Sequence, residues 1–147
     1  MYYGEYKHTC DEKGRIFIPA KFRVIAQGTS IDSFYITRGL EKCLFVYEES
    51  EWVKLTHKFK ELPMTQAKSR AFTRLFFSGA YEATCDKQGR VNIPAHLLEY
   101  ASLKKEAVVI GVSNRFEIWD EKAWKGFYDQ SLASYEKIAE ELVDLGI

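Results

Sequence analysis

The sequence predicts an α+β, β-rich fold in which two similar units form one domain with an approximate two-fold axis and flanking helices. The first observation is a repeat: "DEKGRIFIP" at 11–19 returns as "DKQGRVNIP" at 86–94, 75 positions later. The second is that short apolar segments typical of strands follow each copy in the same order. Since a unit of about 48 residues has a marginal core by itself, we expect the two units to share one core.

Each unit is predicted to contain four short strands. A turn with Asp at its first position and Gly at its fourth, over 11–14, predicts a hairpin between the first two strands. Pro19 predicts the end of the second strand and the start of a short helix, "PAKFRVIA", which the second unit repeats as "PAHLLEYA". The expected strands cover 5–10, 15–18, 34–37 and 43–47, then 84–86, 91–93, 107–110 and 115–119.

Longer helices are predicted after each unit. Ser50 is a candidate N-cap for the first, which Pro63 ends, and Thr65 is a candidate N-cap for a second helix over 66–77. Asp120 is the candidate cap of a last helix, with apolar residues at helical spacing as far as Leu145. The resulting division is a first repeat at 1–52 (core 5–47), a helical connector at 53–75, a second repeat at 76–124 (core 76–119) and a C-terminal helix at 125–147.

The composition, 46% hydrophobic and 29% charged, is typical of a globular protein. We expect neither a membrane span nor a signal peptide, because charges interrupt every apolar run. Three widely spaced cysteines without a C-x-x-C pair favour a reducing cytoplasm. The net charge is zero, but residues 1–74 carry 13 Lys and Arg against 9 Asp and Glu. Any nucleic-acid binding is therefore expected from local basic clusters, mostly in the first half.

Strand alternation sorts the repeated phrase into two faces. The aliphatic positions of both copies fall on one face, which we expect to be core. Arg15 and Arg90 fall on the opposite face, where Phe17 of the first copy corresponds to Asn92 of the second. The outward face therefore keeps its arginine in both units and tolerates a polar neighbour.

Two interpretations of these arginines remain open. In the first, Asp11 and Arg15 form a local pair across the turn, and such an exposed pair contributes about 0–1 kcal/mol. In the second, Arg15 and Arg90 project from a rigid scaffold toward phosphates or guanine edges, and Asp orients the guanidinium group. A pair of arginines related by a two-fold axis suits a double-stranded partner.

The chain also resembles a known family, over about 1–124. The segments "GEYKHTCDEKGRIFIPAKFR", "TRGLEKCLFVY", "RAFTRLFFSGA", "DKQGRVNIPAHLLEYA" and "NRFEIWD" resemble the MraZ family, bacterial transcriptional regulators of the division and cell-wall gene cluster. The resemblance implies two tandem SpoVT/AbrB-like repeats of the double-psi or swapped-hairpin type. It also implies ring-shaped homo-oligomers, association with the nucleoid, and binding to short direct repeats of double-stranded DNA in the protein's own promoter.

Carried over to this sequence, the family's D-x-x-x-R signature implicates four residues: Asp11, Arg15, Asp86 and Arg90. Three further cations of the first unit, Lys13, Lys21 and Arg23, are candidate phosphate ligands. The second unit has Gln88, His96 and Leu98 at the corresponding positions. We therefore expect the second unit to contact DNA more weakly.

Two other classes of function were weighed. The enzyme hypothesis is poor, because the common catalytic motifs are absent and we expect no cofactor, metal or small-molecule substrate. His8 and Cys10 make only half a zinc site, and ordinary packing explains them better. An oligomeric scaffold without direct DNA readout is the stronger alternative. In it, the segment with Phe72, Phe76, Phe77, Arg70 and Arg74 and the last helix would mediate subunit contacts.

Overall fold

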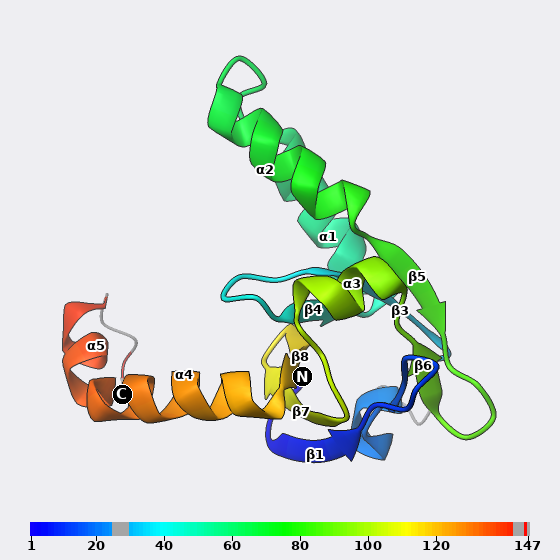
Figure 1. The fold of residues 1–147 in the computed structure, drawn as a ribbon. Coiled ribbons are helices and arrows are strands. Elements are labelled where there is room, and N and C mark those ends of the chain that lie inside the picture. The colour runs from blue at the N-terminus through cyan, green and yellow to red at the C-terminus, as the bar shows by residue number, and fades with distance from the viewer. Residues whose placement is uncertain (25–29, 143–145, 147) are drawn as a thin grey trace.

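The computed structural model describes residues 1–24, 30–142 and 146. Within this described part, the strands form two antiparallel sheets, one of six strands and one of two (Figure 1). The strands are β1 (Glu5–Thr9), β2 (Arg15–Phe17), β3 (Ser33–Arg38), β4 (Leu44–Tyr47), β5 (Tyr81–Thr84), β6 (Arg90–Asn92), β7 (Glu106–Val112) and β8 (Arg115–Asp120). The helices are the 3-10 helix η1 (Ala20–Arg23), α1 (Glu49–Lys60), α2 (Ala67–Ser78), α3 (Ala95–Tyr100), α4 (Glu121–Ala133) and α5 (Tyr135–Glu141).

The two units are interleaved in the large sheet, whose strand order is β1-β7-β8-β4-β3-β5. Exchanging each strand for its counterpart in the other unit reproduces the same order, so the sheet has an approximate two-fold axis between β4 and β8. β1 pairs with β7 of the second unit, and β5 pairs with β3 of the first. The predicted α+β architecture with one shared core is therefore confirmed.

The predicted partner of β1, in contrast, was wrong. The turn is present, with the Gly14 amide donating to the Asp11 carbonyl at 3.0 Å, but β1 and β2 diverge after it. β2 pairs with β6 instead, and this two-stranded sheet is called the ribbon below. Within the described part of one unit, the second strand has no strand to pair with. In the symmetric arrangement, the second strands of the two units form their hydrogen bonds with each other. The exchange matches the swapped-hairpin type of repeat.

The first core lies between the ribbon and the six-stranded sheet. The aliphatic residues of the ribbon point into it, as strand alternation predicted. Phe22 of η1 and Leu97 of α3 close its ends. The ribbon contributes Ile16, Ile18, Val91 and Ile93, and the sheet contributes Phe34, Ile36, Leu44, Val46, Val109, Phe116 and Ile118. The ribbon is thus held against the sheet by its apolar face, and its other face is left outward.

The opposite face of the large sheet is covered by the long helices. α1 packs on β3 and β4, α2 packs on β3, and α4 packs on β7 and β8. Aromatic side chains fill this second core, in which the ring of Trp52 stacks on Tyr35 at 5.2 Å and on Phe76 at 5.7 Å. Figure 1 shows α1 and α2 side by side as a hairpin that projects from the sheet, and α4 projecting in another direction with α5 at its outer end.

Several helix ends differ from the sequence-based expectation. Glu48 and Gln66 are the N-caps of α1 and α2, so Ser50 and Thr65 do not cap them. The Ser50 hydroxyl donates to the Glu48 carboxylate instead, at 2.9 Å. The Asp120 cap is confirmed, since its carboxylate accepts from the Ala123 amide at 3.4 Å.

The last helix is divided at Ser134, where the backbone leaves the helical range between α4 and α5. Leu145, the last apolar residue of the predicted stripe, lies outside the described residues. The end of the predicted helix after Pro19, at residues 25 and 26, also lies outside them. Within the described part, that helix is the short η1, whereas its counterpart in the second unit is the longer α3.

Gly14 tests the close fit between the two units. Its φ is +78°, and an added Cβ would lie 2.8 Å from the carbonyl oxygen of Ile93 and 2.9 Å from Leu98. We expect Gly14→Ala to lower the free energy of unfolding by about 1–3 kcal/mol, because backbone strain adds to overpacking. Urea denaturation measures the change.

Gly126 of α4 is the matched control. An added Cβ there meets nothing within 4 Å, and alanine is the better helix former. Gly126→Ala should raise the stability by about 0.5–1 kcal/mol. Equal effects of the two substitutions would contradict the close approach of the Gly14 turn to the second unit.

Candidate nucleic-acid interface

Each copy of the signature forms a turn whose aspartate organises the arginine; these signature turns are 11–15 and 86–90. In the first, Asp11 Oδ1 accepts from the backbone amides of Lys13 and Arg15, each at 2.9 Å. Asp11 Oδ2 accepts from Arg15 Nε at 2.6 Å. One carboxylate therefore fixes both the turn and the direction of the arginine side chain.

The second signature turn repeats this geometry atom by atom. Asp86 Oδ1 accepts from the amides of Gln88 and Arg90 at 2.9 Å, and Oδ2 accepts from Arg90 Nε at 2.8 Å. The local pair that the sequence suggested is therefore present in both units. Because the same carboxylate also binds two backbone amides, its structural role is larger than that of an isolated surface ion pair.

The hydrogen bonds to these carboxylates lower the pKa of both aspartates below the usual value of 3.8. The largest cause for Asp11 is the bond from the Arg15 backbone amide, and the Arg15 side chain and the Lys13 amide add to it. Asp86 has the same causes from Arg90 and Gln88. At neutral pH both carboxylates are ionised and each holds an arginine beside it.

The aspartates engage the arginines through Nε, which leaves the terminal nitrogens directed elsewhere. In the described part of the chain, Nη1 and Nη2 of Arg15 and Arg90 have no hydrogen-bond partner. The two side chains are 34% and 20% exposed. A guanidinium group fixed at Nε with free terminal nitrogens can form paired hydrogen bonds to an incoming acceptor.

The exchange of strands brings the two arginines onto one face. In the ribbon, Arg15 lies opposite Asn92 and Phe17 lies opposite Arg90. Opposite residues of an antiparallel pair point to the same side, so these four side chains form one outward surface. The Arg90 guanidinium lies 5.9 Å from the centre of the Phe17 ring, a cation–π distance. The signature turns lie at the two ends of this surface.

A family model described as "MraZ protein, putative antitoxin-like" matches the chain twice, over residues 1–75 and 76–146. The chain belongs to the MraZ family. This membership confirms the resemblance and supports a regulator-type role for the chain. Each match contains one signature turn and one strand of the ribbon. The unit that the family model recognises is therefore the same unit that is repeated in this chain.

The other candidate cations of this MraZ chain are distributed unevenly. Lys13 is exposed in the first signature turn. Lys21 is exposed on η1 and lines a separate hollow beside Met1 and Tyr3. Of these two lysines, Lys13 is therefore the one beside the ribbon.

The Arg23 side chain contacts both units. Its Nε donates to the Ile18 carbonyl at 3.1 Å, and its guanidinium carbon lies 2.6 Å from the position of an added Cβ at Gly89. The second signature turn therefore has a cation from the first unit against it. The first signature turn meets Leu98 of the second unit instead. Assigning cations to units by sequence therefore overlooks that the Arg23 guanidinium group reaches the second signature turn.

Sequence reasoning also missed two residues of this surface, Lys87 and Phe17. Lys87 is exposed in the second signature turn, where the first copy has Glu12. Phe17 was noted only for the polar residue that replaces it in the second unit, yet its ring is 42% exposed between Arg90 and His8. Aligning the two copies position by position was the available signal for both.

His8 and Cys10 were considered above as half of a zinc site, and their surroundings bear on that possibility. His8 is half-buried, and burial lowers the pKa of its imidazole, while Cys10 is buried. In the described ranges, His, Cys, Asp and Glu side chains do not gather in groups of three that could hold a metal ion. Among the described helices, none has the length and apolar character needed to cross a bilayer.

The lowered pKa values of the aspartates predict a specific acid sensitivity. Their contribution to stability is complete well above pH 3.8 and is lost as the pH falls through the lower pKa values of the folded state. We expect Asp11→Asn to be less stable than the native chain at pH 7. It should also lose less stability below about pH 4, because a neutral side chain takes up no proton there.

Glu12→Gln is the control for this acid sensitivity. It removes one carboxylate from the same turn, but Glu12 makes no hydrogen bond within the described residues. Denaturant unfolding from pH 7 to about pH 2.5 measures all three chains. The same pH profile for Asp11→Asn and the native chain would show that Asp11 does not organise the turn.

Proposed function

We propose that this protein is a sequence-specific DNA-binding transcriptional regulator of the bacterial division and cell-wall gene cluster. It binds short direct repeats in its own promoter as a ring-shaped homo-oligomer, in the cytoplasm and at the nucleoid. The observation that supports this most is the outward face of the ribbon, where Arg15 and Arg90 are held by identical aspartate contacts.

The geometry of the ribbon suits a duplex. A two-stranded β-ribbon is narrow enough to enter the major groove of B-DNA, and several DNA-binding proteins read bases with such a ribbon. Arginine is the residue that most often reads guanine, through paired hydrogen bonds to O6 and N7. Lys13 and Lys87, exposed in the two signature turns, are placed at the ends of the ribbon to hold phosphates.

The remaining candidates have supporting roles in this proposal. Asp11 and Asp86 orient the arginines and do not touch DNA. Arg23 supports the second signature turn and adds positive charge to it. Lys21 binds phosphate only if the duplex extends past η1. Because few cations are available and the chain is neutral overall, a single subunit binds weakly, and several subunits on tandem sites gain avidity.

Two uncovered surfaces support assembly. α4, α5 and the following Leu142 are together called the arm, which exposes Tyr128, Leu132, Tyr135, Ile138 and Leu142. Figure 1 shows α4 and α5 projecting away from the sheets and from the α1–α2 hairpin. The arm carries five acidic residues against three lysines, and its acidic residues include Glu136, Glu140 and Glu141 near its outer end. Exposed apolar stripes of this kind are typical of protein–protein contacts.

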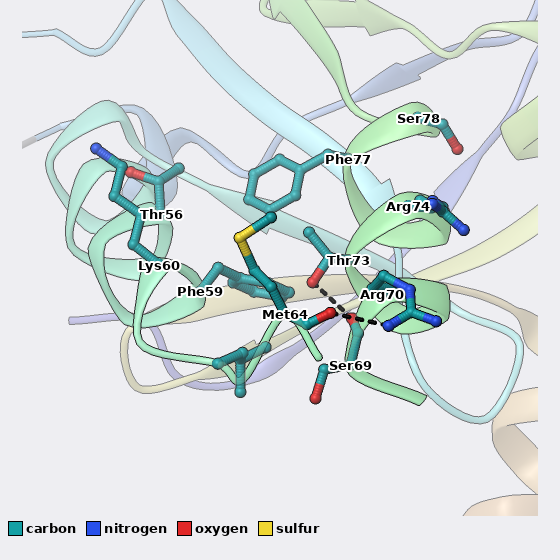
Figure 2. Close-up of a pocket in the computed structure, with 11 residues that line it drawn as sticks. Thr56, Phe59, Lys60, Met64, Ser69, Arg70, Thr73, Arg74, Phe77 and Ser78 are labelled. Carbon is teal, nitrogen blue, oxygen red and sulfur yellow. Dashed lines mark hydrogen bonds between the residues drawn. The ribbon is translucent and has the colours of Figure 1, made fainter. Parts of the chain in front are cut away.

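The second surface is an apolar groove of about 810 Å³ between α1 and α2. Figure 2 shows Phe59, Met64 and Phe77 between the two helices, with Lys60 on α1 and Arg70 and Arg74 on α2. None of the described residues that line it is acidic. We propose that the arm of a second copy occupies this groove, because its apolar stripe and acidic residues complement the groove in both respects. Two different surfaces in one contact give a head-to-tail interface, which closes into a ring when the rotation permits.

An oligomeric scaffold that does not read DNA is the second candidate, and the same two surfaces favour it. The candidates differ in what they require of the ribbon. A scaffold needs the arm and the groove but not the free terminal nitrogens of Arg15 and Arg90. Substitutions in the ribbon therefore separate the two functions.

The first test replaces the arginines. Arg15→Ala and Arg90→Ala should each weaken binding to the DNA upstream of the protein's own gene by about 1–3 kcal/mol, since each removes a paired hydrogen bond to a base. Fluorescence anisotropy across a salt series measures this loss. Light scattering should show unchanged assembly.

Lys54→Ala is the matched control, because it removes one exposed cation that is paired with a carboxylate, Glu51, and that does not line the groove. Its DNA affinity should equal that of the native chain. Native affinity in both arginine variants, with assembly intact, would leave the scaffold as the function.

A second test separates assembly from DNA contact. Leu132→Glu puts a charge on the apolar stripe of the arm, and we expect smaller particles in light scattering. The variant should bind a single repeat with the affinity of the native chain. It should lose the preference for four tandem repeats over one, which avidity is expected to make about 10²-fold or more in the native chain.

Gln130→Glu adds the same charge at a neighbouring exposed polar position and should leave both properties unchanged. If Leu132→Glu assembles normally, the arm is not the subunit contact. If it is monomeric and keeps the preference for four repeats, avidity does not explain that preference.

A further inference from the structure

We infer that the ribbon reads its DNA site in one direction, and that Phe17 and Asn92 supply this direction. The inference rests on the proposed function and adds which side chains distinguish the two ends of the site. It begins with the register of the ribbon, in which Arg15 lies opposite Asn92 and Phe17 lies opposite Arg90.

The approximate two-fold axis of the molecule passes through the middle of the ribbon, at the pair Ile16 and Val91. Rotation about it exchanges Arg15 with Arg90, so the arginines present the same chemistry after the rotation. The same rotation exchanges Phe17 with Asn92. The outward face is therefore symmetric in its charges and asymmetric in its two remaining side chains.

Both of these side chains are available to a ligand. Phe17 is 42% exposed, with its ring beside Arg90 and His8. Asn92 is exposed, and its side-chain amide has no hydrogen-bond partner among the residues that the structure describes. Neither belongs to the core that holds the ribbon, so folding does not require these residue types at these positions.

The two side chains prefer different bases. Asparagine forms paired hydrogen bonds with N6 and N7 of adenine, whereas an aromatic ring makes apolar contact with the methyl group of thymine. The two rows of the ribbon, Arg15 with Asn92 and Phe17 with Arg90, are about 7 Å apart, close to two base-pair steps of B-DNA. A ribbon lying along the major groove would therefore meet guanine contacts at both ends, adenine near one arginine and thymine near the other.

The consequence concerns how the ribbon docks. A fully symmetric ribbon would bind equally well after a half-turn about its axis, and would select a palindromic site. The difference between Phe17 and Asn92 makes one of the two docking directions better, so the selected site is not palindromic. The lysines of the signature turns do not provide this direction, because phosphate contacts carry no base information.

The experiment is a selection of bound duplexes from a randomised pool, by the native chain and by two variants of Phe17. Phe17→Asn makes the outward face symmetric, and we expect its selected site to move toward a palindrome. Phe17→Leu keeps an apolar contact and should select the same non-palindromic site as the native chain. At the thymine position, replacement by uracil should weaken native binding by up to about tenfold and leave Phe17→Asn unaffected.

Thermal unfolding of each variant checks that the fold is kept. We expect little change, because Phe17 is exposed. The inference is overturned if the native chain selects a site and Phe17→Asn selects the same non-palindromic site with unchanged sensitivity to uracil. Asn92→Ala adds a second arm to the test, since it should lose the adenine preference alone. A native chain that selects no sequence would instead overturn the proposed function itself.

Discussion

The antiparallel pairing of β2 with β6 is the constraint on which the rest of the structure depends. It joins the second strand of one unit to the second strand of the other, and its buried Ile16 and Val91 hold the ribbon against the large sheet. Neither unit can satisfy this strand alone. The exchanged edge strands, the shared core and the position of the two signature turns at the ends of one ribbon all follow from that pairing.

The same pairing converts a sequence repeat into a surface. Two arginines that are 75 positions apart in the chain become neighbours on one outward face, each fixed by a carboxylate that also closes its turn. A flexible arginine loses considerable side-chain entropy when it binds, and one that is already oriented loses less. The aspartate contact, which by itself looks like a local ion pair, is therefore compatible with a binding role for the arginine.

Much of this was predictable from the sequence, because the repeat and the strand alternation are local signals. They identified the core face of the ribbon, and they placed Arg15 and Arg90 outward. The partner of each strand was not predictable in this way, since the turn at 11–14 is the same whether its strands pair with each other or with the second unit. Arg23 shows the effect of that ambiguity: its sequence position assigns it to the first unit, where its Nε donates to Ile18, but its guanidinium group also lies against Gly89 of the second unit. The predicted cap at Ser50 failed for another reason, because its hydroxyl donates to the carboxylate of Glu48, the residue that occupies the N-cap position.

The central claim is that the outward face of the ribbon grips a DNA duplex through Arg15 and Arg90. A structure of the assembled protein bound to the DNA upstream of its own gene tests this most directly. The account predicts terminal nitrogens of both arginines within about 3.2 Å of DNA oxygen or nitrogen atoms, with both aspartate contacts retained. A duplex bound to another surface, with both arginines left in solvent, would contradict it.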